Sequence, residues 1–233
     1  MPIAAITPFT TIDFPGRLAA VFFTQGCAWR CAYCQNPLLW SFKAPDQTPL
    51  VPIDKIHAFL QKRRGLIDGI VICGGEPTAH AGLPDFLKHL REAGYQTALH
   101  TGGPSTEALK KALPFVDWVG MDIKSTPEKY ERVTRVAGSA DQVAESARII
   151  TQSGVAHEFR ITVHPMLHSD EDLLAVSRWL KDLGARAFAI QRFRSAGCSD
   201  QRLLDAAAAA AGFPSEETLK TIRTLFADLI IRE

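Results

Sequence analysis

Strand and helix patterns alternate along the chain. Short apolar, β-branched runs predict buried strands at residues 18–24, 70–73, 96–101, 118–123, 159–163 and 187–193. Between them, apolar residues that recur every three or four positions predict amphipathic helices at residues 53–64, 83–93, 105–113, 139–153 and 170–183. This alternation predicts an α/β protein with a parallel sheet and right-handed crossovers.

Glycine and serine positions mark where these helices begin and end. Gly94, Gly154 and Gly184 each follow a predicted helix, as glycine often does at a helix C-terminus. Ser105 is placed to cap the start of another. No linker divides the chain, so we expect residues 1–233 to form a single domain, with a core at about 16–195 and a helical tail at about 201–233.

The tail combines two patterns. Six alanines at residues 206–211 are prone to form a helix, which the Gly-Phe-Pro run at 212–214 interrupts. Ser215 then caps a predicted C-terminal helix, whose apolar face is expected to pack on the sheet rather than bind a partner. That face comprises Leu219, Ile222, Leu225, Phe226, Leu229 and Ile230.

Composition excludes several classes of protein. The 233 residues are 46% hydrophobic and 22% charged, which suits a compact fold with a full core. A net charge of +1 gives no electrostatic case for binding nucleic acid or an anionic membrane. No apolar run approaches the ~20 residues of a membrane span, and no basic signal-peptide segment is expected. Five cysteines, three of them in one motif, indicate reduced thiols and a cytoplasmic location.

The cysteine motif is the strongest chemical feature. Cys27, Cys31 and Cys34 have the spacing C-x3-C-x2-C, with no fourth cysteine nearby. Iron–sulfur cubanes usually have one thiolate per iron, so three thiolates leave one iron open to a small molecule. A zinc site is the alternative, although a closed structural zinc site needs a fourth ligand. Cys73 and Cys198 are expected to be structural.

A second motif follows the predicted strand at residues 70–73. The run Cys-Gly-Gly-Glu-Pro-Thr occupies residues 73–78. Gly74 and Gly75 would let the backbone approach a ligand closely, with carbonyl groups that can accept hydrogen bonds from an ammonium group. Glu76 adds a carboxylate. A tight strand-to-helix turn with a solvated glutamate is the alternative.

Together these motifs resemble the radical S-adenosylmethionine superfamily, over nearly the full length of the chain. The stretch from Thr11 to Pro37 is similar to the activating proteins of glycyl-radical enzymes. Among these it most resembles the longer form of the anaerobic ribonucleoside-triphosphate reductase activating protein. Ala28 and Gln35 depart from the asparagine and histidine that are common there.

The resemblance implies a fold and a cofactor site. The fold is a curved, incomplete (β/α)6 barrel of the radical SAM type with a C-terminal helix. Cys27, Cys31 and Cys34 would hold one [4Fe-4S] cluster, whose fourth iron binds the amine and carboxylate of S-adenosylmethionine. The turn at residues 74–76 would hold the amine.

Other candidate residues lie at the predicted strand ends, where parallel α/β barrels gather their chemistry. The third strand ends in His-Thr-Gly-Gly at 100–103, where activases often have Asp-Thr-Asn-Gly, so Thr101 matches and His100 departs. The fourth ends at Asp122 and Lys124, which resemble the Asp-Leu-Lys of activases and share one face of the strand. A contact with S-adenosylmethionine and a structural ion pair are both open here.

The last two strands carry further candidates. Arg160, inside an apolar strand, requires an anion, which is either the methionine carboxylate or a neighbouring acid. His164 either caps that strand or supports the turn before Pro165. Gln191 is expected to line the adenosine pocket, and Tyr33 to lie beside adenine. The remaining histidines show no ligand spacing and are interpreted as surface or satisfied residues: His57, His80, His89, His157 and His168.

The function that the resemblance implies is an oxidoreductase that acts on a protein. It would cleave S-adenosylmethionine reductively and generate a glycyl radical on the glycine loop of anaerobic ribonucleotide reductase, with reduced flavodoxin or ferredoxin as electron donor. Another glycyl-radical enzyme such as pyruvate formate-lyase, a radical enzyme acting on a small molecule, and a non-enzymatic metal-binding adaptor are the alternatives.

Overall fold

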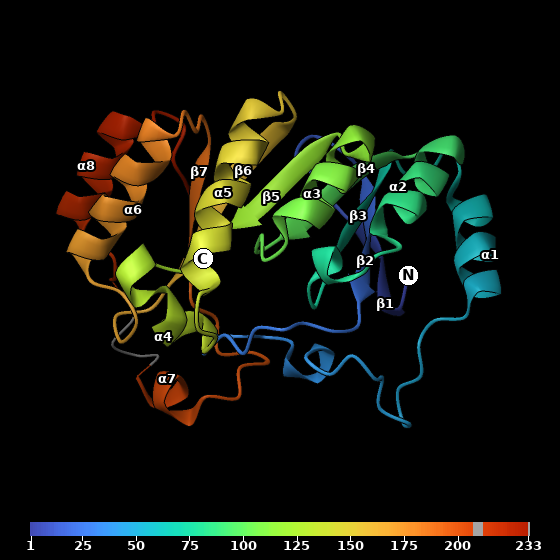
Figure 1. Cartoon of the computed structure of the whole chain (residues 1–233), viewed down its shortest axis with the longest axis horizontal. Coiled ribbons are helices and arrows are strands. Elements are labelled where there is room, and N and C mark those ends of the chain that lie inside the picture. The colour runs from blue at the N-terminus through green and yellow to red at the C-terminus, as the bar shows by residue number, and fades with distance from the viewer. Residues whose placement is uncertain (207–211, 233) are drawn as a thin grey trace. The chain divides into compact units, whose positions relative to one another are not determined.

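The chain divides into two compact units. A computed structural model describes residues 1–206 and 212–232. The first unit comprises residues 1–28 and 38–120, and the second comprises residues 29–37 and 121–233 (Figure 1). Within the described residues, no helix is both long and apolar enough to cross a membrane. The expectation of a single domain stays a prediction.

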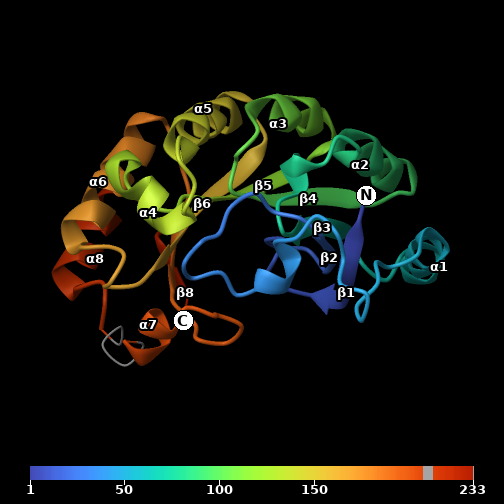
Figure 2. The same ribbon diagram turned by 60° about the horizontal axis from the view of Figure 1, so that its bottom comes forward.

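The first unit contains four strands and most of a fifth. Its strands are β1 (Ile3–Thr10), β2 (Ala19–Thr24), β3 (Gly69–Gly74), β4 (Gln96–Thr101) and β5 (Trp118–Asp122), which continues into the second unit. Its α-helices are α1 (Ile53–Arg63), α2 (Leu83–Glu92) and α3 (Thr106–Ala112), and α2 and α3 lie side by side over the strands (Figure 2). β2, β3 and β4 are parallel, in a register that places Thr24 beside Gly74.

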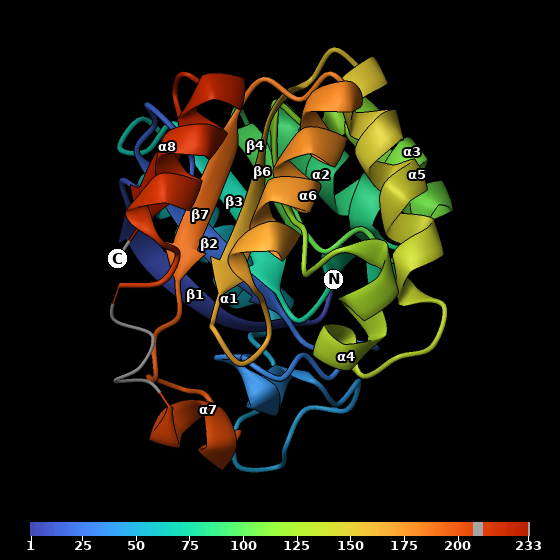
Figure 3. The same cartoon turned by 90° about the vertical axis from the view of Figure 1, so that its left-hand side faces the viewer.

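The second unit repeats the same alternation. Its strands are β6 (Ala156–Val163), β7 (Phe188–Arg192) and β8 (Ile230–Arg232), and all three are parallel. Its α-helices are α4 (Tyr130–Thr134), α5 (Ser139–Gln152), α6 (Asp170–Asp182), α7 (Gln201–Asp205) and α8 (Glu216–Leu225). α6 lies between α5 and α8 (Figure 3). Strand order follows chain order from β1 to β8, which confirms the predicted α/β class with an open sheet.

Local signals explain these boundaries. The Ser105 side chain accepts a hydrogen bond from the N–H of Ala108, which confirms the predicted cap of α3. Gly94, Gly154 and Gly184 have φ values of +91°, +76° and +86°, the left-handed conformation that ends helices. The central strands are buried on both faces. Phe22 of β2 packs against α1 and α2, whereas Val21 and Val71 on the other face lie in an apolar cluster with Phe14.

Two strands at the ends of the chain were not predicted. β1 pairs antiparallel with β2 and contains Pro8, which an edge strand tolerates because one row of its N–H groups has no partner strand. The predicted C-terminal helix ends at Leu225 instead of including Leu229 and Ile230. The chain then forms β8, where β-branched Ile230 and Ile231 favour a strand. α8 packs against α6, and the alanine run beyond Ala206 lies outside the described residues.

Candidate active site

The cysteine motif begins where β2 ends. The N–H of Gly26 donates to the carbonyl of Leu39 at 2.9 Å, and the N–H of Cys27 donates to that of Trp40 at 3.2 Å. Gly26 has a φ of +103°, and a Cβ there would lie 2.5 Å from a ring carbon of Phe42. The positive φ favours glycine at residue 26, and the two backbone hydrogen bonds fix the first cysteine to the first unit.

The other two cysteines are anchored within the second unit. The N–H of Arg30 donates to the carbonyl of Thr134 at 2.9 Å, and that of Ala32 donates to Val133 at 3.0 Å, both at the end of α4. The N–H of Cys34 donates to the carbonyl of Cys31 at 3.0 Å and closes a turn. Burial raises the pKa of the Cys31 thiol, and the nearby Lys124 ammonium opposes this.

The thiols suit a cluster. Cys27, Cys31 and Cys34 form no disulfide with a described residue, and all three are half-buried. Within the described residues, no group of three or more histidine, cysteine, aspartate or glutamate side chains is arranged to hold one metal ion. A cubane places its thiolates on separate irons, so it does not require them to converge on one point. The donor set is therefore compatible with a [4Fe-4S] cluster held by three cysteines.

The Gly-Gly-Glu-Pro turn packs directly on the start of the cysteine motif. The N–H of Gly75 donates to the carbonyl of Thr24, and that of Glu76 donates to Gly26, both at 2.8 Å. A Cβ at Gly75 would lie 2.2 Å from the carbonyl oxygen of Gly26. At Gly74, where φ is +112°, it would lie 2.2 Å from the backbone nitrogen of Thr24. Close approach by the protein's own backbone is thus sufficient reason for both glycines.

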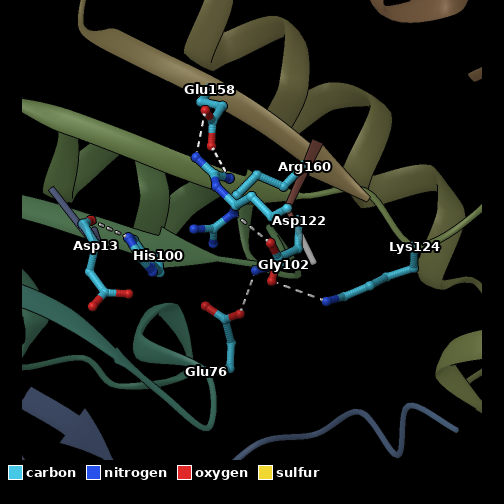
Figure 4. A network of polar contacts seen from close by, with 9 residues as sticks. Asp13, Glu76, His100, Gly102, Asp122, Lys124, Glu158 and Arg160 are labelled. Atoms are coloured by element: carbon cyan, nitrogen blue, oxygen red, sulfur yellow. Dashed lines mark hydrogen bonds and ion pairs between the residues drawn. The ribbon is translucent and has the colours of Figure 1, made fainter. Parts of the chain in front are cut away.

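The Glu76 carboxylate ties the ends of β3 and β4 together. Its Oε1 accepts hydrogen bonds from the N–H and hydroxyl of Thr78, at 2.9 and 2.7 Å, and from the Thr101 hydroxyl at 2.6 Å. Its Oε2 accepts one from the N–H of Gly102 at 2.9 Å (Figure 4). Burial raises the pKa of Glu76, and the hydrogen bonds oppose this. The alternative of a solvated glutamate is wrong, because the residue is only 3% exposed.

Asp122, Lys124 and Arg160 form a charged group in the second unit. Arg160 Nε donates to Asp122 Oδ1 at 2.9 Å, and Lys124 Nζ donates to Oδ2 at 3.3 Å (Figure 4). The predicted ion pair and the acid beside Arg160 are both present. Burial lowers the pKa of the Lys124 ammonium, but Asp122, together with smaller contributions from Tyr33, Cys31 and Tyr130, raises that pKa well above its usual value.

Tyr33 belongs to the same unit as this charged group. Lys124 Nζ lies 5.5 Å from the centroid of its ring, a cation–π contact. The Tyr33 hydroxyl is buried and makes no hydrogen bond with a described residue. Burial raises the pKa of this hydroxyl. The Tyr33 ring therefore lies against the Lys124 ammonium.

His164 and Gln191 have different environments. His164 Nδ1 accepts a hydrogen bond from the N–H of Met166 at 3.1 Å, so it supports the turn that follows Pro165. Gln191 is half-buried on β7 and pairs in register with Thr162. No described contact joins either side chain to the charged group, so their roles at S-adenosylmethionine stay predictions.

Three polar residues in this region carry contacts that sequence reasoning did not assign. His168 Nε2 lies 2.8 Å from the carbonyl oxygen of Lys124, so the expected satisfied histidine supports the backbone of the charged group. Glu158, two residues before Arg160, is buried and paired with Arg232 from β8. The only sequence signal for Glu158 is an acidic residue inside an apolar strand.

Comparison with known proteins identifies the family. The family model described as the Radical SAM superfamily matches residues 21–180. The chain belongs to the radical SAM superfamily. A putative glycyl-radical enzyme activating enzyme of Methanocaldococcus jannaschii is 26% identical over 206 residues, covering 85% of this chain and 82% of that protein. The pyruvate formate-lyase-activating enzyme of Streptococcus mutans is 31% identical over 190 residues, covering 75% and 70%. The chain is thus a member of the glycyl-radical enzyme activase group.

Solved structures support the fold of this radical SAM protein. Streptococcus suis SuiB bound to the precursor peptide SuiA aligns with a TM-score of 0.65 at 12% identity, covering 91% of this chain and 48% of SuiB. A domain of the pyruvate-formate lyase-activating enzyme from Bacteroides vulgatus aligns with a TM-score of 0.55 at 16% identity, covering 71% of this chain and 99% of that domain. The family implies a [4Fe-4S] cluster and S-adenosylmethionine.

Proposed function

We propose that this radical SAM protein activates anaerobic ribonucleoside-triphosphate reductase by generating a glycyl radical on it. The relatives named as activating enzymes support the reaction class. The stretch from Thr11 to Pro37, which resembles the reductase activating proteins, supports this particular partner.

Cys27, Cys31 and Cys34 hold the cluster in this proposal, and the turn at Gly74, Gly75 and Glu76 holds the methionyl amine. A carboxylate has roughly four lone-pair sites. Three donors already engage Oε1 of Glu76, whereas one engages Oε2. Oε2 is therefore the atom with room for an ammonium group. Thr101 acts through Glu76 by fixing the orientation of its carboxylate.

Lys124 receives the methionyl carboxylate in this proposal. Its ammonium has three donors, of which one reaches Asp122 at the long distance of 3.3 Å. A buried ammonium with unused donors favours an anionic ligand, since charge-assisted hydrogen bonds are strongest away from water. Asp122 and Arg160 keep the ammonium in place. Tyr33 and Gln191 line the adenosine, and His164 shapes the loop after β6.

The bound cluster and S-adenosylmethionine supply one-electron cleavage of the sulfonium and removal of a hydrogen atom from glycine, giving methionine and 5′-deoxyadenosine. Reduced flavodoxin or ferredoxin supplies the electron. The protein's own residues hold the reacting groups close and exclude water, because a carbon radical reacts with almost any neighbour. The enzyme acts on a protein and not on nucleic acid or a membrane, in the cytoplasm.

The decisive experiment offers two partners to the reduced protein. With S-adenosylmethionine and anaerobic ribonucleotide reductase, we expect an EPR doublet on the reductase, because one α-hydrogen remains on the glycine radical. Pyruvate formate-lyase is the second candidate partner, favoured by the 31% identical Streptococcus mutans relative. Activation of the lyase alone would contradict the proposed partner and leave the reaction class intact.

A further inference from the structure

Arginines are concentrated in three segments of the second unit. One is the cysteine loop at residues 29–37, which contains Cys31 and Cys34. The others are residues 130–138, which begin with α4, and residues 192–202, which end in α7. The three segments contain six arginines and two acidic residues, which gives them a formal charge of +4, whereas the whole chain has a net charge of +1.

The two outer segments pack directly against the cysteine loop. On one side, the N–H of Ala32 donates to the carbonyl of Val133 in α4 at 3.0 Å. On the other, Gln35 Nε2 donates to the carbonyl of Arg194 at 3.2 Å. Ala32, Val133 and Leu203 of α7 belong to one apolar cluster, which joins all three segments. The arginines of α4 and α7 therefore border the loop that carries two of the three cysteines.

Three of these arginines carry their charge at the surface. Arg132 is exposed, and its Nη2 donates to the uncharged carbonyl of Met166 at 2.6 Å. Arg135 and Arg202 both pair with Asp200. The Asp200 side chain is 8% exposed, whereas those of Arg135 and Arg202 are 42% and 74% exposed. A protein that approaches this surface therefore meets the guanidinium groups rather than the carboxylate.

We propose that Arg132, Arg135 and Arg202 are part of the docking surface for the electron donor, an acidic one-electron carrier protein such as flavodoxin. The inference rests on the proposed function, which requires a protein to reduce the cluster. One electron leaves the reduced carrier, which is oxidised, and enters the cluster, which is reduced. Because Cys31 and Cys34 are half-buried on the loop that the arginines border, a carrier docked there is close to the cluster that these thiols would hold.

The charge of the surface suits this kind of partner. Redox proteins form small, transient interfaces, in which little apolar area is buried. Complementary charge then raises the rate of encounter and orients the partner. Such attraction between exposed groups weakens as salt screens the charges. Binding of the carrier should therefore depend on both the arginines and the ionic strength.

The test removes three charges from cluster-loaded protein. In R132Q/R135Q/R202Q, affinity for oxidised flavodoxin should fall about tenfold at low salt, because these charges attract the acidic carrier. Isothermal titration calorimetry measures this directly. The rate at which reduced flavodoxin supports formation of 5′-deoxyadenosine should fall by a similar factor. Both quantities should fall with rising salt in the wild type and change little with salt in the variant.

A single substitution guards against a variant that does not fold. R202Q changes the most exposed of the three side chains and should weaken flavodoxin binding about threefold. R148Q is its matched control, because Arg148 is an exposed arginine of the same unit, paired with Glu145 on α5. It should bind flavodoxin like the wild type. Equal affinities in R202Q and R148Q would contradict the inference.

A small reductant separates docking from the chemistry that follows. Photoreduced deazariboflavin needs no docking surface, so the cleavage of S-adenosylmethionine that it drives should be the same in the triple variant and the wild type. Iron content should also be the same. If cleavage falls equally with flavodoxin and with deazariboflavin, the arginines act on the cluster itself, and the inference is wrong.

The remaining outcomes concern the identity of the partner. If the triple variant keeps its affinity for flavodoxin, the inference is wrong. If it instead loses affinity for anaerobic ribonucleotide reductase, the surface binds the protein substrate, which also overturns the inference. If the wild type with deazariboflavin does not cleave S-adenosylmethionine, the proposed function fails, whereas the flavodoxin affinities still decide the role of the arginines.

Discussion

The turn at residues 74–76 and the charged group of Asp122, Lys124 and Arg160 solve different problems. In the turn, hydrogen-bond donors without charge surround one buried carboxylate, and backbone contacts leave no room for a Cβ at either glycine. In the charged group, the Asp122 carboxylate accepts hydrogen bonds from the cationic side chains of Lys124 and Arg160. Close contacts between backbone atoms hold the turn in place, whereas electrostatic attraction holds the side chains of the charged group. A substitution in the turn should therefore act through a steric clash, whereas a substitution in the charged group should act through the loss of an attractive charge.

The largest effect is expected at the three cysteines. Cys31→Ala removes one of three thiolates and should abolish the cubane, because a thiolate is needed for each iron that the protein holds. Iron content and cluster absorbance after anaerobic reconstitution measure this. Cys198→Ala is the control variant and should retain about four irons per chain. Stoichiometric zinc in the wild type would contradict the cluster.

The next largest effect tests the close backbone contacts of the turn. Gly75→Val places a Cβ against the carbonyl of Gly26, one residue before Cys27, so the turn or the cysteine loop must move. Overpacking of this kind costs roughly 1–3 kcal/mol. We expect lower thermal stability, and loss of the EPR change that S-adenosylmethionine causes in the reduced cluster. Gly82→Val, where a Cβ meets nothing within 4 Å, is the control. A normal EPR response in Gly75→Val would show that the turn tolerates displacement.

A smaller effect tests the charge of Lys124. Lys124→Gln removes the ammonium, and affinity for S-adenosylmethionine should fall about 30-fold, which corresponds to ~2 kcal/mol for a charged hydrogen bond. The protein should still fold and load iron, since Asp122 keeps Arg160 as a partner. Lys111→Gln, at an exposed pair on α3, should change nothing. If Lys124→Gln binds S-adenosylmethionine as tightly as the wild type does, then Lys124 does not bind the methionyl carboxylate.

The smallest effect concerns Asp200, which belongs to neither region. Arg202 and then Arg135 lower the pKa of Asp200 to about 2. A carboxyl with a lowered pKa stabilises the fold above its ordinary pKa of about 3.9, and this contribution is lost as pH falls towards 2. Asp200→Asn should therefore lower stability at pH 7 by less than ~1 kcal/mol, because both arginines are largely exposed. Urea unfolding at pH 7 and pH 3 should show the difference shrinking at the lower pH.

The sequence predicted the regular part of the fold because local signals agree there. β4 has the predicted bounds, and Ser105 caps α3 as expected, since apolar runs and caps act over a few residues. β8 was missed because its partner strand β7 is separated from it along the chain by α7 and α8. β1 pairs with the next strand along the chain, but Pro8 obscures its strand pattern.

The candidate site was predictable in its residues but not in its connections. Cys27, Cys31, Cys34 and the glycine turn are visible as spacing. The donors to Glu76 are different: Thr101 and Gly102 lie on the next strand, and only the fold brings them to the carboxylate. The pairing of Glu158 with Arg232 likewise depends on the order of β6, β7 and β8. The spacing of residues within one loop is visible in the sequence. Which charged residues pair between strands is visible only in the structure.

The contact between Gly75 and Gly26 has a consequence for how such chains evolve. A descendant that lost its cofactor would still need Gly74 and Gly75, because a Cβ at either position would clash with backbone atoms of Thr24 or Gly26. Purifying selection would therefore preserve the Gly-Gly turn in inactive copies. No steric constraint of this kind would preserve a lysine at position 124 once the ligand is no longer bound. Among relatives of this protein, the turn therefore records ancestry, and a lysine at position 124 is the better marker of retained activity.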